Sequence, residues 1–210
     1  MNGAEYIVSF LAKKKCNNIF VVTGGACAFI IDEIARNPNL KYYPMQHEQS
    51  AAMAADALWK VDRKIGVTVA TSGPGATNLI TGIACSFFDS IPSIHLTGQV
   101  NQREKEIYGG TKVRQAGFQQ TDIVEMVKPI TKYSVQVTSA EELKLELAKA
   151  YSIAISGRMG PVLIDIPMDI QQLELEEEIV EIKPENPKLH DKEIIAVSYT
   201  HLTLPTILLV

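Results

Sequence analysis

The chain has 210 residues, of which 46% are hydrophobic, 21% charged and 7% aromatic. This ordinary globular composition excludes a disordered, collagen-like, coiled-coil or membrane-spanning protein, and the length is enough to bury one sizeable core. With 20 Lys and Arg against 24 Asp and Glu, the net charge of −4 offers no basic footprint for nucleic acid.

The cysteines and the first segment bear on the compartment. Cys16, Cys27 and Cys85 are an odd number without metal-ligand spacing, which indicates reduced thiols. In the first segment, MNGAEYIVSFLAKKKC, the charges follow the apolar stretch, which is the reverse of a secretory leader. We therefore expect a cytoplasmic protein that binds neither nucleic acid nor membranes.

Helical spacing and short apolar runs alternate along the chain, with Gly and Pro between them. The helical spacing predicts helices over residues 4–15, 29–36, 48–59, 76–88 and 140–156. The apolar runs predict strands over residues 18–23, 40–45, 65–71, 91–97, 131–137 and 161–166. A polar, irregular segment follows residue 97 as far as residue 120. This alternation predicts an α/β fold of three layers, αβα, in which a mostly parallel six-stranded sheet has helices on both faces.

Four loops directly follow predicted strands, at residues 23–26, 46–49, 72–78 and 98–102. In parallel sheets, ligands bind outside the carboxyl ends of the strands. We therefore expect these loops to meet at one edge of the sheet and to form the binding site there.

Composition divides the chain into three parts. Residues 1–170 form the α/β domain. Residues 171–196 are acidic and interrupted by Pro184 and Pro187, which indicates an exposed linker and the start of a further, central domain, or alternatively an acidic interaction tail. Residues 197–210 begin with VSYTHLTLPT, which resembles the translation of a sequencing adaptor; the alternative is a natural apolar strand. We interpret them as an adaptor artefact and exclude them from fold reasoning.

The turn at residues 73–78, GPGATN, lies between a predicted strand and a predicted helix. Its glycines let a backbone approach a ligand, and the helix that follows offers free N–H groups. It matches the dinucleotide-binding fingerprint only in part, because Asn78 replaces the third glycine. Either a ligand or the steric needs of a tight turn accounts for this segment, and the Gly24-Gly25 turn is weaker evidence for a site.

Glu48 opens an Ala-rich helix and has two interpretations. It is either a first-turn carboxylate that the helix dipole stabilises by about 0.3–1 kcal/mol, or a carboxyl group that hydrogen-bonds a ring nitrogen in a closed cofactor pocket. The residues alone favour the first. His47 is interpreted as a packed or hydrogen-bonded side chain, because no second His or Cys stands at metal spacing. The alanines at residues 51–57 permit close approach of a partner subunit or of a neighbouring helix.

Five stretches carry a family resemblance: FVVTGGA, QHEQSAAMAADA, VTVATSGPGATNLITGIACSFFDSIPSIHLTGQV, GFQQTDIVEMVKPITKY and SGRMGPVLIDIPMDIQ. Together they resemble the amino-terminal pyrimidine-binding domain of thiamine-diphosphate enzymes, in the acetolactate-synthase-like branch, over about residues 2–172. The resemblance implies an enzyme that decarboxylates a 2-oxoacid on thiamine diphosphate and joins the product to a second oxoacid.

The resemblance implies a role for several residues. Glu48 matches the catalytic glutamate that hydrogen-bonds N1′ of the aminopyrimidine and favours the tautomer that removes the C2 proton of the thiazolium. This role replaces the dipole interpretation. Gly25 matches the glycine near the reacting C2 and the bound 2-oxoacid, while Pro74 and Asn78 match the turn packed near the pyrimidine.

Further positions concern the substrate and a flavin. Phe118 and Gln119 match the pair that borders the substrate and the activated ring, and Arg158 matches a position that contacts FAD. The chain departs from the family where VVTGGA replaces GYPGGA, where Gln120 stands in place of a common glutamate, and in the more polar and charged residues 102–115. These departures leave FAD binding and acetolactate synthesis itself open.

The family holds the diphosphate and its Mg²⁺ with a Gly-Asp-Gly motif on a separate carboxy-terminal domain, and this motif does not occur in the sequence. The resemblance therefore implies that this chain supplies no metal ligand, that it is an amino-terminal fragment inactive alone, and that the parent protein is a homodimer or homotetramer. Two alternatives stay open, a 2-oxoacid decarboxylase without carboligation and a non-catalytic α/β binding module.

Overall fold

A single parallel sheet organises the part of the chain that the computed structural model describes, residues 1–106, 111 and 113–184. Its strands are β1 (Asn18–Val21), β2 (Lys41–Pro44), β3 (Gly66–Ala70), β4 (Ser93–Gln99), β5 (Tyr133–Gln136) and β6 (Val162–Pro167). They lie in the order β2-β1-β3-β4-β6-β5, and every neighbouring pair is parallel. The six predicted strands are confirmed, and the sheet is entirely rather than mostly parallel.

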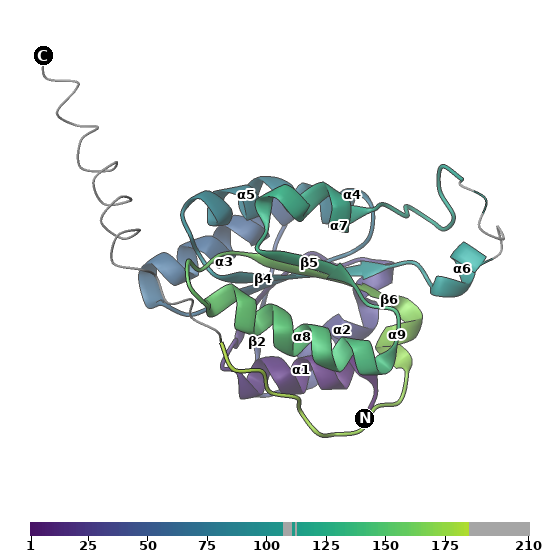
Figure 1. The fold of residues 1–210 in the computed structure, drawn as a ribbon, viewed down its shortest axis with the longest axis horizontal. Helices are drawn as coiled ribbons and strands as arrows, with labels where there is room; N and C mark the ends of the chain where they lie inside the picture. Colours follow the sequence, from purple (N-terminus) through teal and green to yellow (C-terminus); the bar gives the residue numbers. More distant parts are fainter. Residues whose placement is uncertain (107–110, 112, 185–210) are drawn as a thin grey trace, which may run out of the picture.

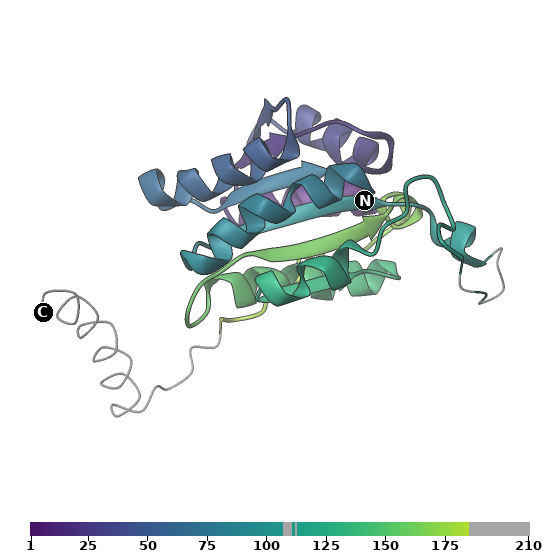
Figure 2. The ribbon, with the colours of Figure 1, turned by 90° about the horizontal axis from the view of Figure 1, so that it is seen from above.

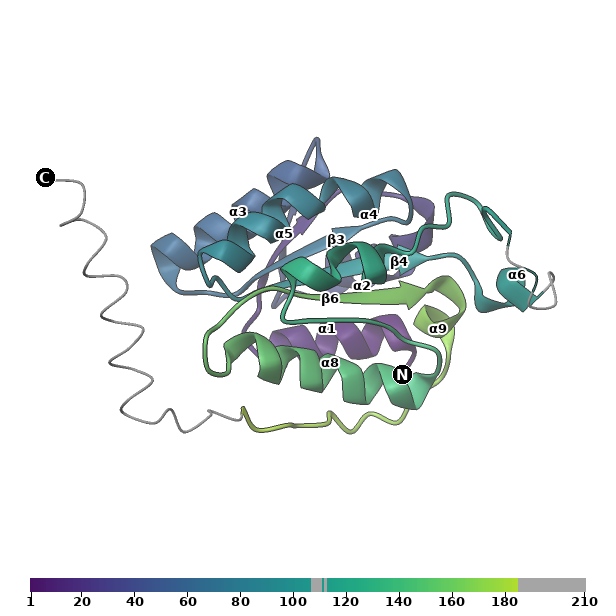
Figure 3. The ribbon, with the colours of Figure 1, turned by 45° about the horizontal axis from the view of Figure 1, so that its top comes forward.

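Helices cover both faces of this sheet, which confirms the three predicted layers (Figure 1). One layer consists of α1 (Gly3–Lys13), α2 (Ala28–Arg36), α8 (Ala140–Ile155) and α9 (Met168–Gln172). The other layer, which Figure 2 views from above, consists of α3 (Glu48–Asp62), α4 (Pro74–Asn78), α5 (Ile80–Phe88) and α7 (Ile123–Val127). The short helix α6 (Gln102–Glu106) projects beyond the end of the sheet where β4 and β6 finish (Figure 3). None of the helices described has the length and apolar character needed to cross a membrane.

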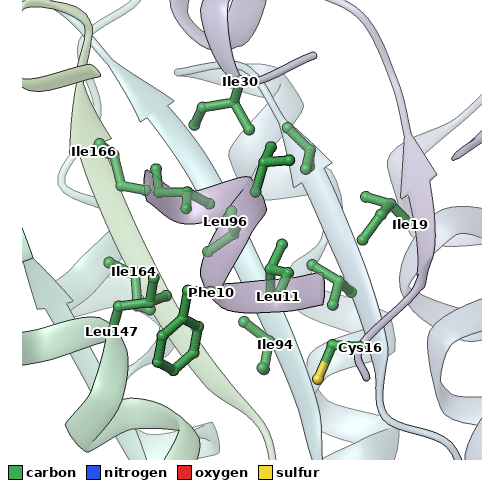
Figure 4. Packing of buried hydrophobic residues seen from close by; sticks show 14 of the residues in the cluster. Phe10, Leu11, Cys16, Ile19, Ile30, Ile94, Leu96, Leu147, Ile164 and Ile166 are labelled. Atoms are coloured by element: carbon green, nitrogen blue, oxygen red, sulfur yellow. The ribbon is translucent and has the colours of Figure 1, made fainter. Parts of the chain in front are cut away.

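The larger hydrophobic core lies between the sheet and the α1 layer. Figure 4 shows Phe10 and Leu11 of α1 and Leu147 of α8 packed over β4 and β6, where they meet Leu96 and Ile164. All five side chains are fully buried. Because helices cover both faces, β3, β4 and β6 are buried at every position. The sequences of β3 and β6 are accordingly mostly apolar, whereas β4 alternates apolar residues with buried polar ones that have hydrogen-bond partners.

Two segments differ from the sequence prediction. The helix predicted over residues 76–88 is divided into α4 and α5 at Leu79, and it begins earlier, because Pro74 occupies a first-turn position that needs no N–H. The irregular segment after residue 97 contains α6. Part of that segment, residues 107–110 and 112, lies outside the described residues.

The acidic segment after β6 stays on the domain as far as it is described. The predicted boundary at residue 170 falls inside α9, and the chain then runs along α1 (Figure 1). There Leu175 N–H donates to Met1 C=O at 2.8 Å and Val180 N–H donates to the Tyr6 hydroxyl at 3.1 Å. Glu181 pairs with two lysines at the end of α1. Residues 185–210, including the predicted adaptor sequence at 197–210, lie outside the described part.

The alanines of α3 serve close packing inside the domain. A Cβ built on Gly82 of α5 would lie 2.4 Å from Ala52 Cβ, and one built on Gly66 of β3 would lie 2.7 Å from Ala55 Cβ. Backbones at this distance leave no room for larger side chains. The predicted intradomain contact is confirmed, and a subunit interface on α3 stays a prediction.

His95 is fully buried in β4 between two hydroxyl groups. Its Nδ1 lies 2.8 Å from Thr68 Oγ1 and its Nε2 lies 2.9 Å from Ser93 Oγ. A neutral imidazole donates from one nitrogen and accepts at the other, and a hydroxyl can take either part. Burial disfavours the charged ring and lowers the pKa of His95 to about 3.

This buried ring predicts a loss of stability in acid. The unfolded chain binds a proton at His95 below pH 6.5 while the folded chain does not, so the free energy of unfolding falls as pH falls from 6.5 toward 3. The contribution of this residue is about 1.4 kcal/mol per pH unit. Denaturant unfolding at pH 7 and pH 4.5 is expected to show a smaller difference in the His95→Gln variant than in the parent chain, by about 2–3 kcal/mol. An imidazole that titrates near pH 6.5 in the folded protein, observed by NMR, would contradict this account.

Candidate cofactor site

The loops after β1, β2, β3 and β4 meet at the carboxyl edge of the sheet, as predicted. A Cβ built on Gly24 would lie 2.4 Å from Thr71 Cβ, and one built on Gly98 would lie 2.0 Å from the Ala26 carbonyl oxygen. Gly24 and Gly98 are therefore required because a side chain at either position would collide with the neighbouring loop. The order of the strands in the sheet places these loops next to each other.

Glu48 is the first residue of α3, and its side chain is only 8% exposed. Asn78 Nδ2 donates to Glu48 Oε2 at 3.0 Å, and a Cβ on Gly75 would lie 3.2 Å from Oε1. No lysine or arginine nitrogen in residues 1–104, 111 and 113–184 lies within ion-pairing distance of this carboxyl group. The neighbouring His47 caps the helix, because its Nδ1 accepts from the Gln49 N–H at 3.2 Å, and this confirms a hydrogen-bonded histidine.

A cavity of about 280 Å³ lies at the same edge. It brings together the predicted residues Gly25, Phe118 and Gln119. A Cβ on Gly25 would meet nothing within 4 Å, so this glycine faces open space and the fold itself does not require it. Phe118 is 78% exposed, so most of its ring stays in contact with solvent beside the cavity.

The turn at Gly73 holds the Phe118 segment in place. Gly73 has a φ of 65°, and a Cβ there would lie 2.6 Å from the Gln119 carbonyl oxygen. Gln119 itself has a φ of 56°, in the left-handed region that only glycine adopts freely. Gln120 Oε1 accepts from the Ala116 N–H at 2.7 Å, so its side chain closes the turn.

Thr71 connects the cavity with Glu48. Its Oγ1 accepts from the Ala26 N–H at 3.2 Å, and its Cγ2 would lie 2.8 Å from a Cβ on Gly75. Thr71 therefore lies between the Gly24 turn, which lines the cavity, and the Gly75 turn, which lies against the Glu48 carboxyl. Pro74 begins α4 in this second turn but does not line the cavity.

Three residues that line this cavity lie outside the predicted site residues and loops: Thr71, Glu104 and Met168. Thr71 is a polar residue at the end of a predicted strand, a signal that could have identified it. Met168 directly follows β6, whose carboxyl end belongs to the same edge, so the strand pattern could have identified it too. Glu104 lies in a polar segment without periodicity, and nothing in the sequence distinguishes it from its neighbours.

Arg158 lies at the opposite edge of the sheet. Its Nε donates to Ser90 Oγ at 2.7 Å, in the turn that precedes β4. With Lys132, Phe87, Phe88 and Met159 it lines a separate cavity of about 220 Å³. The structure therefore does not bring Arg158 together with the other predicted site residues.

Cys27 lies beside the Gly25 turn, with a Sγ–H that donates to the Gly24 carbonyl at 3.4 Å. Burial raises the pKa of this thiol to about 12, which makes it a poor nucleophile at neutral pH. Among the described residues, no three His, Cys, Asp or Glu side chains gather closely enough to hold a metal ion.

Comparison with known proteins places the chain in a family. Residues 1–126 match the family described as thiamine pyrophosphate enzyme, N-terminal TPP binding domain. The acetolactate synthase large subunit of Corynebacterium glutamicum is 39% identical over 176 residues, which are 84% of this chain and 27% of that protein. The isozyme 2 large subunit of Escherichia coli (strain K12) is 43% identical over 171 residues, 81% of this chain and 30% of that protein.

A chloroplastic relative extends the same pattern. Acetolactate synthase 1 of Oryza sativa subsp. japonica is 39% identical over 170 residues, 81% of this chain and 25% of that protein. The chain thus spans less than a third of the length of these curated relatives. The chain belongs to the thiamine pyrophosphate enzyme family, as an acetolactate-synthase-like N-terminal TPP binding domain.

Proposed function

We propose that this chain is the pyrimidine-binding part of an enzyme that decarboxylates a 2-oxoacid and joins the product to a second oxoacid. The observation that carries the proposal is the Glu48 carboxyl, buried at the start of α3 and held by Asn78 at the edge where the loops meet. The acetolactate synthase relatives support the class of reaction.

The residues at this edge fit a thiamine diphosphate pyrimidine. Asn78 Nδ2 donates a hydrogen bond to Glu48 Oε2. The other oxygen, Oε1, accepts no hydrogen bond from any described residue and lies close to Gly75. Oε1 is therefore available to a ring nitrogen. Pro74 and Asn78 would pack beside the ring, and Gly25 leaves the space in which the reacting carbon and a 2-oxoacid would lie.

When bound, thiamine diphosphate supplies the carbon nucleophile and the electron sink that decarboxylation needs. Glu48 would share a proton with the pyrimidine through Oε1, and Asn78 would keep its carboxyl group in one orientation through Oε2. Phe118 and Gln119 would border the substrate and limit the access of water to the cavity.

The rest of the active site is proposed to come from outside this chain. Residues 1–170 would bind the pyrimidine and residues 171–196 would lead to a central domain, while a carboxy-terminal domain would hold the diphosphate and Mg²⁺. The chain spans only 25–30% of its relatives, and it lacks the Gly-Asp-Gly motif. The complete protein would be a cytoplasmic homodimer or homotetramer. A role of Arg158 in FAD binding stays a prediction, since its exposed guanidinium lines the cavity of about 220 Å³ at the other edge.

Activity assays on two proteins test this proposal. The complete protein, expressed from the uninterrupted gene, is expected to consume pyruvate only with thiamine diphosphate and Mg²⁺, and to accumulate acetolactate. The 210-residue chain alone is expected to show no turnover, because it lacks the residues proposed to hold the diphosphate.

Each other outcome identifies a different function. Free acetaldehyde in place of acetolactate would indicate decarboxylation without carboligation. Failure of the complete protein to consume any 2-oxoacid would indicate a binding module. Thiamine-dependent turnover by the 210-residue chain would contradict the division of the active site.

A further inference from the structure

A second and larger cavity, of about 760 Å³, lies at the opposite edge of the sheet. It is lined where β1, β2 and β3 begin, by Cys16 and Asn18, by Lys41 and by Ile65. Figure 4 shows Cys16 at this end of the core, with Ile30 at the other end. No residue lines both this cavity and the one beside Gly25, so the two are separate sites.

Five cationic side chains line this amino-edge cavity, and no acidic residue does: they are Lys14, Lys15, Lys41, Arg63 and Lys64. Lys14 pairs with Glu181 and Lys64 pairs with Asp62, two carboxylates outside the lining. The other three cations have no ion pair in the described part of the chain. The cavity therefore presents an excess of positive charge that favours an anionic ligand.

Aromatic and apolar side chains form the rest of the wall together with three asparagines, and Trp59 and Tyr151 are the largest of them. The Arg63 guanidinium lies 5.9 Å from the centre of the Trp59 ring, and Lys14 Nζ lies 5.3 Å from the centre of the Tyr151 ring. A ligand with phosphate groups and a planar ring would match the cations and the aromatic side chains.

Stabilisation of helix ends accounts for only part of this charge. α1 and α3 both end at the cavity, and cations near a helix carboxyl end offset its dipole. However, Lys15 and Arg63 have φ of 60° and 56°, at positions after a helix where glycine is favoured. Lys41 begins a strand and has no helix end to stabilise. The cations therefore come from three separate segments, and stabilisation of the ends of α1 and α3 does not explain all of them.

We propose that the amino-edge cavity binds a nucleoside di- or triphosphate. The cations at Lys15, Lys41 and Arg63 contact the phosphates, and the base packs against the Trp59 side. The cavity volume lies within the range of about 300–1,000 Å³ that small-molecule sites occupy. This site is independent of the proposed thiamine chemistry at the other edge.

Trp59 is the only tryptophan of the chain, so its fluorescence reports on this cavity alone. Titration of the 210-residue chain with ADP, excited beyond the adenine absorption band, is expected to give a saturable change. Pyrophosphate and adenosine, measured by competition or directly, are expected to bind at least about tenfold more weakly, since each lacks one half of the contacts. Equal affinity of either one with ADP would overturn the proposal.

Two glycine variants test the cations without loss of the fold. Lys15→Gly and Arg63→Gly each remove a charge at a position whose φ suits glycine, and each is expected to raise the Kd for ADP about tenfold. Ser90→Gly is the matched control, because Ser90 has a φ of 59° and lies outside this cavity. Unchanged affinity in both cation variants would refute the site. Loss of affinity in Glu48→Gln instead would refute it too, by placing ADP at the other edge.

Discussion

Replacing Glu48 with Gln is expected to lower the 2-oxoacid turnover of the complete enzyme by about 10²- to 10⁴-fold, the usual contribution of a positioned acid–base group. The amide keeps the shape of the side chain, and its oxygen can still accept from Asn78 Nδ2. It cannot exchange a proton with a pyrimidine nitrogen. We therefore expect kcat and the exchange of the cofactor C2 proton, followed by NMR in D₂O, to fall together while the unfolding midpoint changes little.

Asp56→Asn is the matched control for this variant. Asp56 is another buried carboxylate of α3, but it accepts from Ser86 Oγ at 3.0 Å and pairs with Lys60 at 2.7 Å, away from the cofactor site. Loss of the Asp56 carboxylate is expected to lower the free energy of unfolding by about 1–3 kcal/mol without slowing exchange of the cofactor C2 proton. If Glu48→Gln retained the full rate of C2 proton exchange, the carboxyl group would have no part in catalysis. That result would support the alternative of a non-catalytic binding module.

The largest effect on stability is expected at Gly98. A Cβ there would lie 2.0 Å from the Ala26 carbonyl oxygen, and that oxygen is held by Gln171 Nε2 at 2.8 Å. Because the obstacle is backbone rather than a flexible side chain, the Gly25 turn must move. We expect Gly98→Ala to lower the free energy of unfolding by about 3 kcal/mol, measured by urea denaturation, and to disturb the cavity beside Gly25.

Gly25→Ala separates this steric effect from function. The added Cβ would meet nothing within 4 Å, so the free energy of unfolding is expected to stay within about 0.5 kcal/mol of the parent chain. The methyl group would still occupy the space proposed for the reacting atoms and so lower kcat of the complete enzyme. If Gly25→Ala and Gly98→Ala lowered the free energy of unfolding equally, the close contact between Gly98 and Ala26 would not be the cause of the destabilisation.

Much of the fold was predictable because its signals are local. β3 and β6 are buried on both faces, and their sequences are therefore mostly apolar along their whole length. The carboxyl edge was predictable from the same pattern, since all parallel strands end on one side. Within the candidate site, Glu48 could be placed at a helix start, but its partner could not be identified from the residues around it.

The features that could not be predicted are those that a long-range contact decides. The acidic segment has no periodicity, yet it follows α1 because backbone groups at Met1 and the Tyr6 hydroxyl pair with it. Glu104 lines the cavity although its helix α6 projects beyond the sheet, because the segment that returns at Gly117 lies against it. Neither contact has a signature near it in the sequence, because each joins segments far apart along the chain.

By itself, the sequence determined the alternation of strands and helices, the edge at which a ligand would bind, and the family to which the chain belongs. Only the tertiary structure decided which groups meet. It joined Asn78 to Glu48 and placed Thr71 between two glycine turns. It also gathered cations from three segments into one cavity at the amino edge. The physical reason is strand order: β2, β1 and β3 are neighbours through pairing between distant segments, and local patterns do not encode that pairing.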